Sequence, residues 1–252
     1  MSTLILGDVQ PPTESFITYG GEKIYYQRLA RNEEIRRIKI KVYPDCRVEV
    51  LAPQTANDSE VAENVKLKAR WIAKKLKVFQ EQLNGVTPRR YVSGESHYYL
   101  GKQYQLKVVV SGFDEVGVKL FRGVLRVTVR EKETEAVKRQ LSDWYRSKAR
   151  EIFGSRMEAL LGQTLWVPDK PSMRILSMRS QWGSCSPKGT ITLNPMLVKA
   201  SKDCIDYVIL HEFCHLAEHN HSERFYRLMS QVMPNWEVVK NRLDTKASLY
   251  LA

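Results

Sequence analysis

The chain has 252 residues, of which 43% are hydrophobic and 27% charged, a balance typical of globular proteins and unlike that of disordered or fibrous chains. Its 40 Lys and Arg against 28 Asp and Glu give a net charge of +12, which favours contact with polyanions without specifying one. No apolar run approaches the ~20 residues needed to cross a bilayer, and no basic n-region of a signal peptide is present. We therefore expect a cytoplasmic protein without membrane contact, whose four scattered cysteines are reduced.

The N-terminal third predicts strands followed by a helix. Residues 23–29 can pair with 36–43, where apolar and basic side chains alternate, and 47–52 forms the next strand. Asn57 to Ser59 can cap a helix that runs to about Leu83. Its basic segment 61–77 is a candidate for polyanion contact, although a solvated helix surface explains the same charges, and we interpret Trp71 as a packing anchor.

Residues 84–130 predict a further β-rich segment, with turns at Gly101-Lys102 and Arg122-Gly123. A helical pattern then runs from 131 to about Leu161. His97 precedes the first of these strands, far from the other histidines, and has no predicted function. We divide the chain into a region 16–130 and a region 131–252, or one compact unit made of both.

Two short strands flank a polar loop in residues 173–195. The alternation across 190–194 (Thr-Ile-Thr-Leu-Asn) predicts an exposed edge strand. Such an edge can bind an extended peptide by strand addition, or its polar residues can serve only to blunt it.

The sequence His211-Glu212-Phe213-Cys214-His215 is the most informative stretch, and four of the chain's five histidines lie in residues 211–221. Ser201 can cap a helix that begins near Lys202 and contains this motif. Two histidines four residues apart share one helix face and can bind one zinc ion, while the adjacent carboxylate reaches the water on the metal.

The third ligand is less obvious from the spacing. His219 would lie a further ~6 Å along a continuous helix, too far for a shared ion. Asn220 can end the helix in the left-handed conformation, after which His221 can turn back to the metal. We favour His221, with a carboxylate from Glu223 or Glu237 as the alternative.

Three protein ligands leave one position of a tetrahedral zinc for water, as catalysis requires. Glu212 then serves as general base. Arg179, Tyr207 and the backbone amides around Trp182 and Gly183 are candidate donors to the developing oxyanion. We expect 179–184, which ends at Ser184, to form a wall facing Glu212, and Tyr207 fits a helix-packing role equally well.

Several of these stretches resemble the YgjP-like metal-dependent hydrolases, also called the YgjP-like metallopeptidase domain family. They are Arg179-Ser-Gln-Trp-Gly-Ser-Cys-Ser, Ile191-Thr-Leu-Asn, Asp206-Tyr-Val-Ile-Leu-His-Glu-Phe-Cys-His-Leu and Asn220-His-Ser, and the likeness extends over most of 22–240. It implies a zincin-like C-terminal region with one zinc ion on His211, His215 and His221 and with Glu212 as base. Phe213 departs from the leucine that is usual in the family.

We therefore expect an α+β protein: a β-rich N-terminal region with a basic helix and a C-terminal zincin-like region with an active-site helix. The expected function is zinc-dependent hydrolysis of peptides or proteins. Some members of the family that this sequence resembles are described as hydrolysing nucleoside triphosphates, notably UTP. A nucleoside triphosphate pyrophosphohydrolase that uses the same metal cleft is therefore the first alternative. A zinc-stabilised module that binds a polyanion or a partner is the second.

Overall fold

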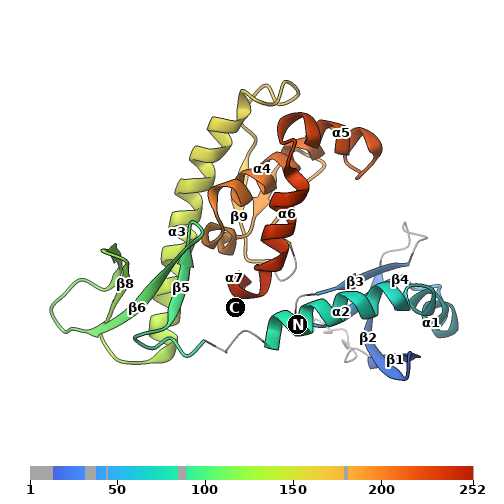
Figure 1. The fold of residues 1–252 in the computed structure, drawn as a ribbon, viewed down its shortest axis with the longest axis horizontal. Coiled ribbons are helices and arrows are strands. Elements are labelled where there is room, and N and C mark those ends of the chain that lie inside the picture. Colours follow the sequence, from blue (N-terminus) through green and yellow to red (C-terminus); the bar gives the residue numbers. More distant parts are fainter. Residues whose placement is uncertain (1–13, 32–37, 44, 85–88, 179–180, 252) are drawn as a thin grey trace, which may run out of the picture. The chain divides into compact units, whose positions relative to one another are not determined.

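A computed structural model describes residues 14–31, 38–43, 45–84, 89–178 and 181–251. Contacts divide the chain into an N-terminal unit, Met1–Gly85, and a C-terminal unit, Val86–Ala252, each with its own hydrophobic core (Figure 1). Helices and sheets occur in both units, which confirms the α+β class. No helix in the described part of the chain is long and apolar enough to cross a membrane.

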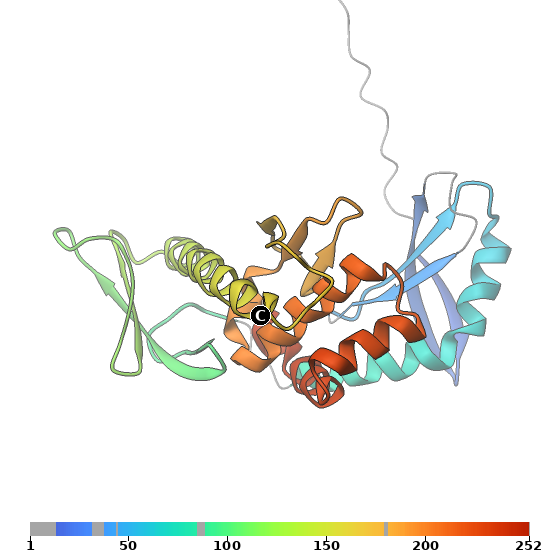
Figure 2. The same ribbon diagram turned by 90° about the horizontal axis from the view of Figure 1, so that it is seen from above.

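The N-terminal unit packs two helices against a four-stranded sheet (Figure 2). Its strands follow the order β1-β2-β4-β3, and only β2 and β4 run parallel. The core forms because alternate strand residues such as Val50 meet the apolar helix positions Val61, Val65 and Ile72. The elements are β1 (Glu14–Tyr19), β2 (Glu22–Arg31), β3 (Lys39–Val42), β4 (Val48–Pro53), α1 (Asp58–Leu67) and α2 (Ala69–Asn84).

Three expectations for this unit need correction. Strand β2 pairs with β1 and β4 rather than with β3, and the Gly20-Gly21 turn between β1 and β2 has positive φ at both residues. The predicted long helix is interrupted at Lys68, although Asn57 caps its start as expected, by accepting from the Glu60 amide at 2.8 Å. Trp71 is 44% exposed and is therefore not a buried anchor.

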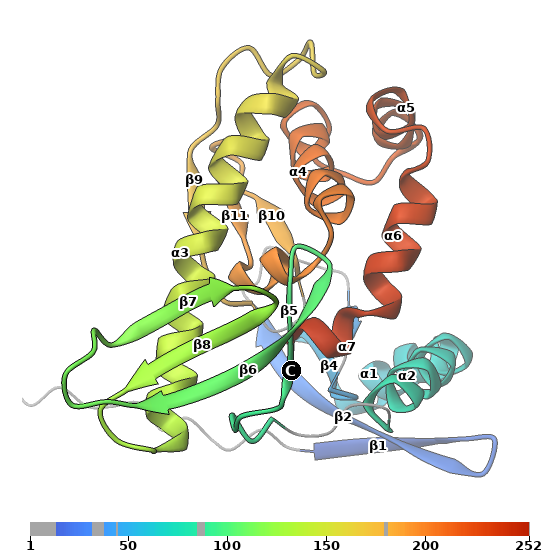
Figure 3. The ribbon, with the colours of Figure 1, turned by 60° about the vertical axis from the view of Figure 1, so that its left-hand side comes forward.

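The C-terminal unit begins with a second four-stranded sheet, ordered β5-β6-β8-β7, which lies against the long helix α3 (Figure 3). The turn predicted at Gly101-Lys102 lies one residue earlier, at Leu100-Gly101, and the turn at Arg122-Gly123 is where it was predicted; all four residues have positive φ. The elements are β5 (Ser96–Tyr99), β6 (Lys102–Val110), β7 (Gly117–Phe121), β8 (Val124–Val129) and α3 (Thr134–Leu161).

The turn at Gly101 also fixes the start of the helix that carries the histidine motif. The Leu100 and Gly101 amides donate to the carbonyls of Val198 and Lys199, at 2.9 and 3.0 Å. A Cβ on Gly101 would lie 2.9 Å from Ser201 Cβ, so a side chain there would displace one of the two segments. Because this sheet shares its core with α3 and the segments after it, the division at residue 85 replaces the expected one at 130.

A three-stranded sheet, ordered β10-β11-β9, and four α-helices complete the unit. Strand β11 lies in the middle of this sheet, with Ile191 and Leu193 fully buried, so the expected edge strand at 190–194 is wrong. The edge beside α4 is β10 instead. The elements are β9 (Met173–Ile175), β10 (Gly183–Cys185), β11 (Ile191–Leu193), the 3-10 helix η1 (Pro195–Lys199), α4 (Lys202–Ala217), α5 (Glu223–Val232), α6 (Trp236–Thr245) and α7 (Ala247–Leu251).

Candidate metal centre

Helix α4 carries His211, Glu212 and His215 and is fixed from two sides. Arg156 on α3 makes a two-pronged ion pair with Asp206, with N–O distances of 2.7 and 2.8 Å. The Trp166 indole donates to the Phe213 carbonyl at 2.9 Å, within the turn that holds the motif. Phe213, the departure from the usual leucine, is fully buried and packs in the core as an apolar residue should.

Helix α4 ends earlier than the sequence suggested. Its last residue is Ala217, and Glu218 follows in an extended conformation with φ of −147°. Asn220 does not adopt the left-handed conformation that we expected of it. The extended chain after Ala217 therefore makes the return towards the helix, and it leaves His219 exposed.

Three histidine side chains converge at this return. Ring nitrogens of His211, His215 and His221 all lie within 4.8 Å of one another, and His221 Nε2 is 3.1 Å from His211 Nε2. Among the described residues, this cluster includes neither His219 nor the alternative carboxylates Glu223 and Glu237. The geometry therefore groups the three histidines that the sequence favoured.

Phe225 forms a common floor beneath the three imidazoles. Its ring centroid lies 4.9, 4.7 and 4.7 Å from those of His211, His215 and His221, and its side chain is only 1% exposed. Ser222, which accepts from the Phe225 amide at 3.3 Å, caps α5 as expected and places this ring one turn into the helix. The floor is apolar, so it fixes the rings without competing for their nitrogens.

The histidine nitrogens are suited to bind a metal ion. His215 Nδ1 lies 3.1 Å from the Glu218 carbonyl, which can only accept, so Nδ1 carries the proton and Nε2 keeps a free lone pair. Burial lowers the pKa of His211 to about 3, helped by the neighbouring histidines, so this ring is also neutral near pH 7. Three imidazoles around one point fit a divalent ion such as zinc.

Glu212 lies beside the cluster in a dry environment. Its side chain is 3% exposed, and Oε2 has no hydrogen-bond partner among the described residues. Burial raises the pKa of Glu212 to about 8, because a low dielectric disfavours the charged form. A buried carboxylate without a partner is costly unless something else at the site uses it.

Gly183 on β10 forms the wall against Glu212. A Cβ on Gly183 would lie 2.5 Å from Glu212 Oε1 and 3.0 Å from Cδ, so only glycine lets this strand run so close to the carboxylate. Trp182 and Ser184 flank it and are partly buried. Of the wall expected from residues 179–184, the part from Trp182 to Ser184 therefore lies beside Glu212. Arg179 lies outside the described residues.

Asn194 holds the loop that leads to β10, a role that the sequence did not reveal. The residue is 1% exposed, and its Nδ2 donates to the carbonyls of Met178 and Gln181, at 2.7 and 3.1 Å. Its Oδ1 accepts from the Met196 amide at 3.1 Å, and its own amide donates to the Trp182 carbonyl. An Asn directly between a strand and Pro195 was the available signal, but local spacing cannot show which distant carbonyls it binds.

Tyr207 lies one turn before His211 on α4. Its ring centroid is 5.9 Å from that of His211, and the side chain is largely buried. Burial raises the pKa of Tyr207 above its usual value, so the phenol keeps its proton. This placement supports the packing role foreseen for Tyr207 and leaves its role as an oxyanion donor a hypothesis.

Comparison with known proteins places this geometry in a family. A family model described as YgjP-like, metallopeptidase domain, matches residues 36–246, which include the histidine cluster, Glu212, Gly183 and Asn194. No curated protein matches the chain.

Two solved metallopeptidase zymogens are similar to part of the chain. Abylysin of Pyrococcus abyssi is 24% identical, with a TM-score of 0.33, over 39% of this chain and 93% of that one. Jannalysin of Methanocaldococcus jannaschii is 20% identical, with a TM-score of 0.32, over 39% of this chain and 96% of that one. Because the family model spans most of the sequence, the chain belongs to the YgjP-like metallopeptidase-domain family and is a metal-dependent hydrolase.

Proposed function

We propose that the protein is a zinc-dependent metallopeptidase in which His211, His215 and His221 hold one zinc ion. The observation that carries this proposal is the convergence of three imidazoles within 4.8 Å beside a buried carboxylate. Three protein ligands are typical of a catalytic zinc, whereas structural zinc sites usually have four. A zinc ion held there supplies Lewis-acid chemistry, because it acidifies a water molecule and polarises the carbonyl that is attacked.

Glu212 is the general base in this proposal. In its ionised form the carboxylate accepts a proton from the attacking water and returns it to the leaving amine. Its burial and its contact with Gly183 hold it in one position, so little reorganisation is needed during the reaction. Ordered positioning of this kind supports a catalytic rather than a structural role for the residue.

A peptide is the substrate class that the neighbouring strand supports. β10 pairs with β11 on one side and with no strand on the other among the described residues. An extended peptide can add to such an edge through its backbone, and Gly183 on this strand already contacts Glu212. Trp182 and Ser184 flank the contact and are the residues proposed to line the bound chain.

The first test separates catalysis from metal binding. Glu212→Gln is expected to keep one zinc ion per chain and to lose about 10²- to 10⁴-fold in turnover, the range typical of general-base removal. His221→Ala is expected to lose both metal and turnover, while His219→Ala, which changes an exposed histidine outside the cluster, keeps both. Metal analysis and peptide turnover measure these outcomes, and undiminished turnover in Glu212→Gln contradicts the proposal.

The second test separates the two substrate classes. Wild-type protein with one zinc ion is offered a panel of unstructured peptides and, in parallel, UTP, with pyrophosphate release as the readout for the nucleotide. We expect peptide cleavage that depends on Glu212. Glu212-dependent pyrophosphate release without peptide cleavage would replace the peptidase with the pyrophosphohydrolase alternative. Zinc that stays bound with neither activity would favour the structural-zinc binding module.

A further inference from the structure

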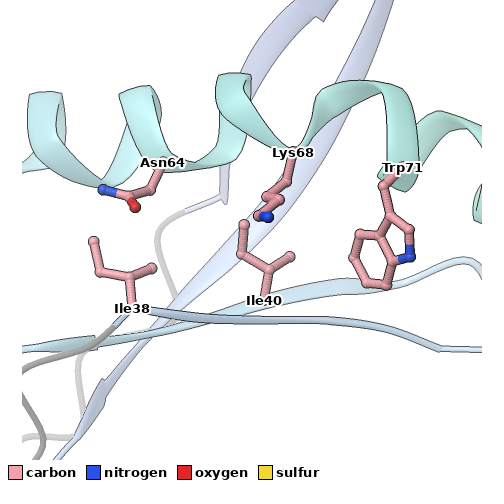
Figure 4. A pocket seen from close by; sticks show the side chains of 5 residues that line it. All are labelled: Ile38, Ile40, Asn64, Lys68 and Trp71. Carbon is pink, nitrogen blue, oxygen red and sulfur yellow. The ribbon is translucent and has the colours of Figure 1, made fainter.

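The N-terminal unit contains a groove that the proposed chemistry does not use. It has a volume of about 400 Å³, within the range of ligand sites, and lies between strand β3 and the α1–α2 helices (Figure 4). Ile40 on β3 and Ile38, the residue before β3, point towards the helices, and Asn64, Lys68 and Trp71 point from the helical segment towards the strand.

The spacing of the helical residues explains why they share this face. Asn64, Lys68 and Trp71 are four and three residues apart, which places them one above another along a helix. The interruption at Lys68 does not rotate them away from β3. As a result, the 44% exposed Trp71 ring and the two isoleucines give the groove an apolar interior with one ammonium group.

The strand beside the groove has an open edge. β3 is the last strand in the order β1-β2-β4-β3, and within the described chain it pairs only with β4, from Lys39 opposite Leu51 to Val42 opposite Val48. The backbone groups on its other side can therefore pair with an added strand. The lysines at 39 and 41 alternate with the isoleucines and point to the opposite face, so they do not fill the groove.

The charge of the groove indicates what it can bind. None of the described residues that line it carries a carboxylate, and Lys68 makes no ion pair with any of the described residues, whereas its neighbour Lys66 pairs with Glu63 at 2.9 Å. Helix α2 adds four cations, Arg70, Lys74, Lys75 and Lys77, against the single acid Glu81. A ligand that brings both an apolar side chain and a carboxylate matches this combination.

We propose that this groove binds an extended acidic peptide segment, which adds as a strand to β3. An apolar side chain of the peptide fills the space between Ile40 and Trp71, and a carboxylate of the peptide meets Lys68. Nucleic acid fits less well, because single strands are bound on successive aromatic platforms and, among the described residues, Trp71 is the one aromatic side chain that lines the groove. The site is built from the N-terminal unit alone and needs no metal, so it does not rest on the proposed peptidase function.

The binding test uses a fluorescein-labelled peptide, Asp-Leu-Glu-Val-Glu-Leu-Asp, and the full-length chain carrying Glu212→Gln, so that the probe is not cleaved. Fluorescence anisotropy is expected to show saturable binding of equal strength with zinc and after metal removal. A failure of the zinc chemistry therefore leaves this result unaffected. Absence of saturable binding would contradict the proposal.

A matched pair of charge reversals tests the place of binding. Lys68→Glu is expected to weaken the acidic peptide roughly tenfold or more, because a carboxylate then faces a carboxylate. Lys77→Glu makes the same change in net charge on the exposed surface of α2, outside the groove lining, and is expected to have a much smaller effect. Equal weakening by the two variants would show only general attraction to a basic helix and would overturn the site.

Two further probes test the mode of binding. A peptide with proline at its central position is expected to bind weakly, since it cannot complete the backbone pairing, and the parent peptide without proline should slow amide exchange in β3. A labelled single-stranded oligothymidine should bind more weakly than the peptide and should not displace it. Equal binding of the proline peptide, or displacement by the oligonucleotide, contradicts strand addition of a peptide.

Discussion

Gly183 and Glu212 show how one missing side chain can set the position of the proposed general base. The Cα of Gly183 approaches the carboxylate so closely that an added methyl group would lie 2.5 Å from Oε1. Real contacts of that length do not occur, so one of the two groups would have to move. Because Glu212 is packed in a buried site, the displacement would reach the carboxylate oxygens that are proposed to exchange the proton.

We predict that Gly183→Ala lowers peptide turnover by about 10²-fold, since a shift of ~1 Å in a reacting group costs that much. Zinc content should stay at one ion per chain, because the three atoms nearest to the new methyl group all belong to Glu212 and none to a histidine of the cluster. Gly162→Ala is the control, as a Cβ there meets nothing within 4 Å. Normal turnover of Gly183→Ala would contradict the claim that the close approach of Gly183 positions Glu212 for catalysis.

His97 illustrates a titratable group that affects stability instead of catalysis. It is 2% exposed, and its Nε2 lies 3.5 Å from Glu95 Oε2, an ion pair only when the ring is protonated. Burial lowers the pKa of His97 to about 4, with further lowering by the positive charges of Arg89 and Lys199, so the ring is neutral near pH 7. The sequence had left this histidine without a role, and its burial could not be read from its position before a strand.

The folded-state pKa of His97 lies below the ~6.5 of an unfolded chain, so its stabilising contribution is complete above pH ~6.5 and is lost as the pH falls towards 4. We predict that His97→Phe reduces the loss of unfolding free energy between pH 7 and 4.5 by about 2 kcal/mol. Denaturant unfolding of metal-free protein at the two pH values measures it. His219→Phe, which changes an exposed histidine, is the control and should leave the pH dependence of the unfolding free energy unaltered. An unaltered pH dependence in His97→Phe as well would contradict the prediction, because it would mean that His97 takes up no proton on unfolding.

At the scale of elements, the sequence located the helix of the histidine motif within one residue of its start and identified both Gly-containing turns. These elements carry strong local information: a helical apolar pattern, residues that favour positive φ, and Ser201 at the N-cap position, although its side chain does not make the expected capping hydrogen bond. The histidines that cluster could be chosen because their positions follow from helix geometry and a short return. Local sequence patterns were therefore sufficient to predict these elements.

Local sequence patterns did not show which strands pair with one another. The segment 191–193 alternates as an edge strand should, yet it is central, because β9 pairs with it from 16 or more residues away. Similarly, β2 pairs with β1 and β4, and alternation alone does not distinguish these partners from β3. The interruption between α1 and α2 at Lys68 could not be predicted from the sequence either, because lysine is a good helix former.

At the scale of the whole molecule, the two hydrophobic cores coincide with the two units. The histidine cluster, Glu212, the β10 wall, α3 and the sheet β5–β8 all belong to Val86–Ala252. The groove beside β3 belongs to Met1–Gly85. Since the family model covers residues of both units, neither one alone accounts for what the family shares.

We predict that the fragment 86–252 folds cooperatively and binds one zinc ion, because its core is of the size that stabilises an independent domain. Calorimetry and metal analysis of the isolated fragment measure both properties. The same fragment carrying His221→Ala is expected to fold but to bind zinc weakly. A fragment that is unfolded, or that binds no zinc although it is folded, would show that residues 1–85 are needed to build the centre.

The choice of three imidazole ligands has a consequence for product release. Imidazole nitrogens bring no negative charge to a metal, and the Phe225 ring beneath them adds none, so a divalent ion bound there would retain its full double charge. In the proposed reaction, each cut peptide bond would leave a new carboxylate beside that charge. We therefore expect competitive inhibition by simple carboxylates, and this inhibition would be weaker had Glu223 or Glu237 supplied the third ligand.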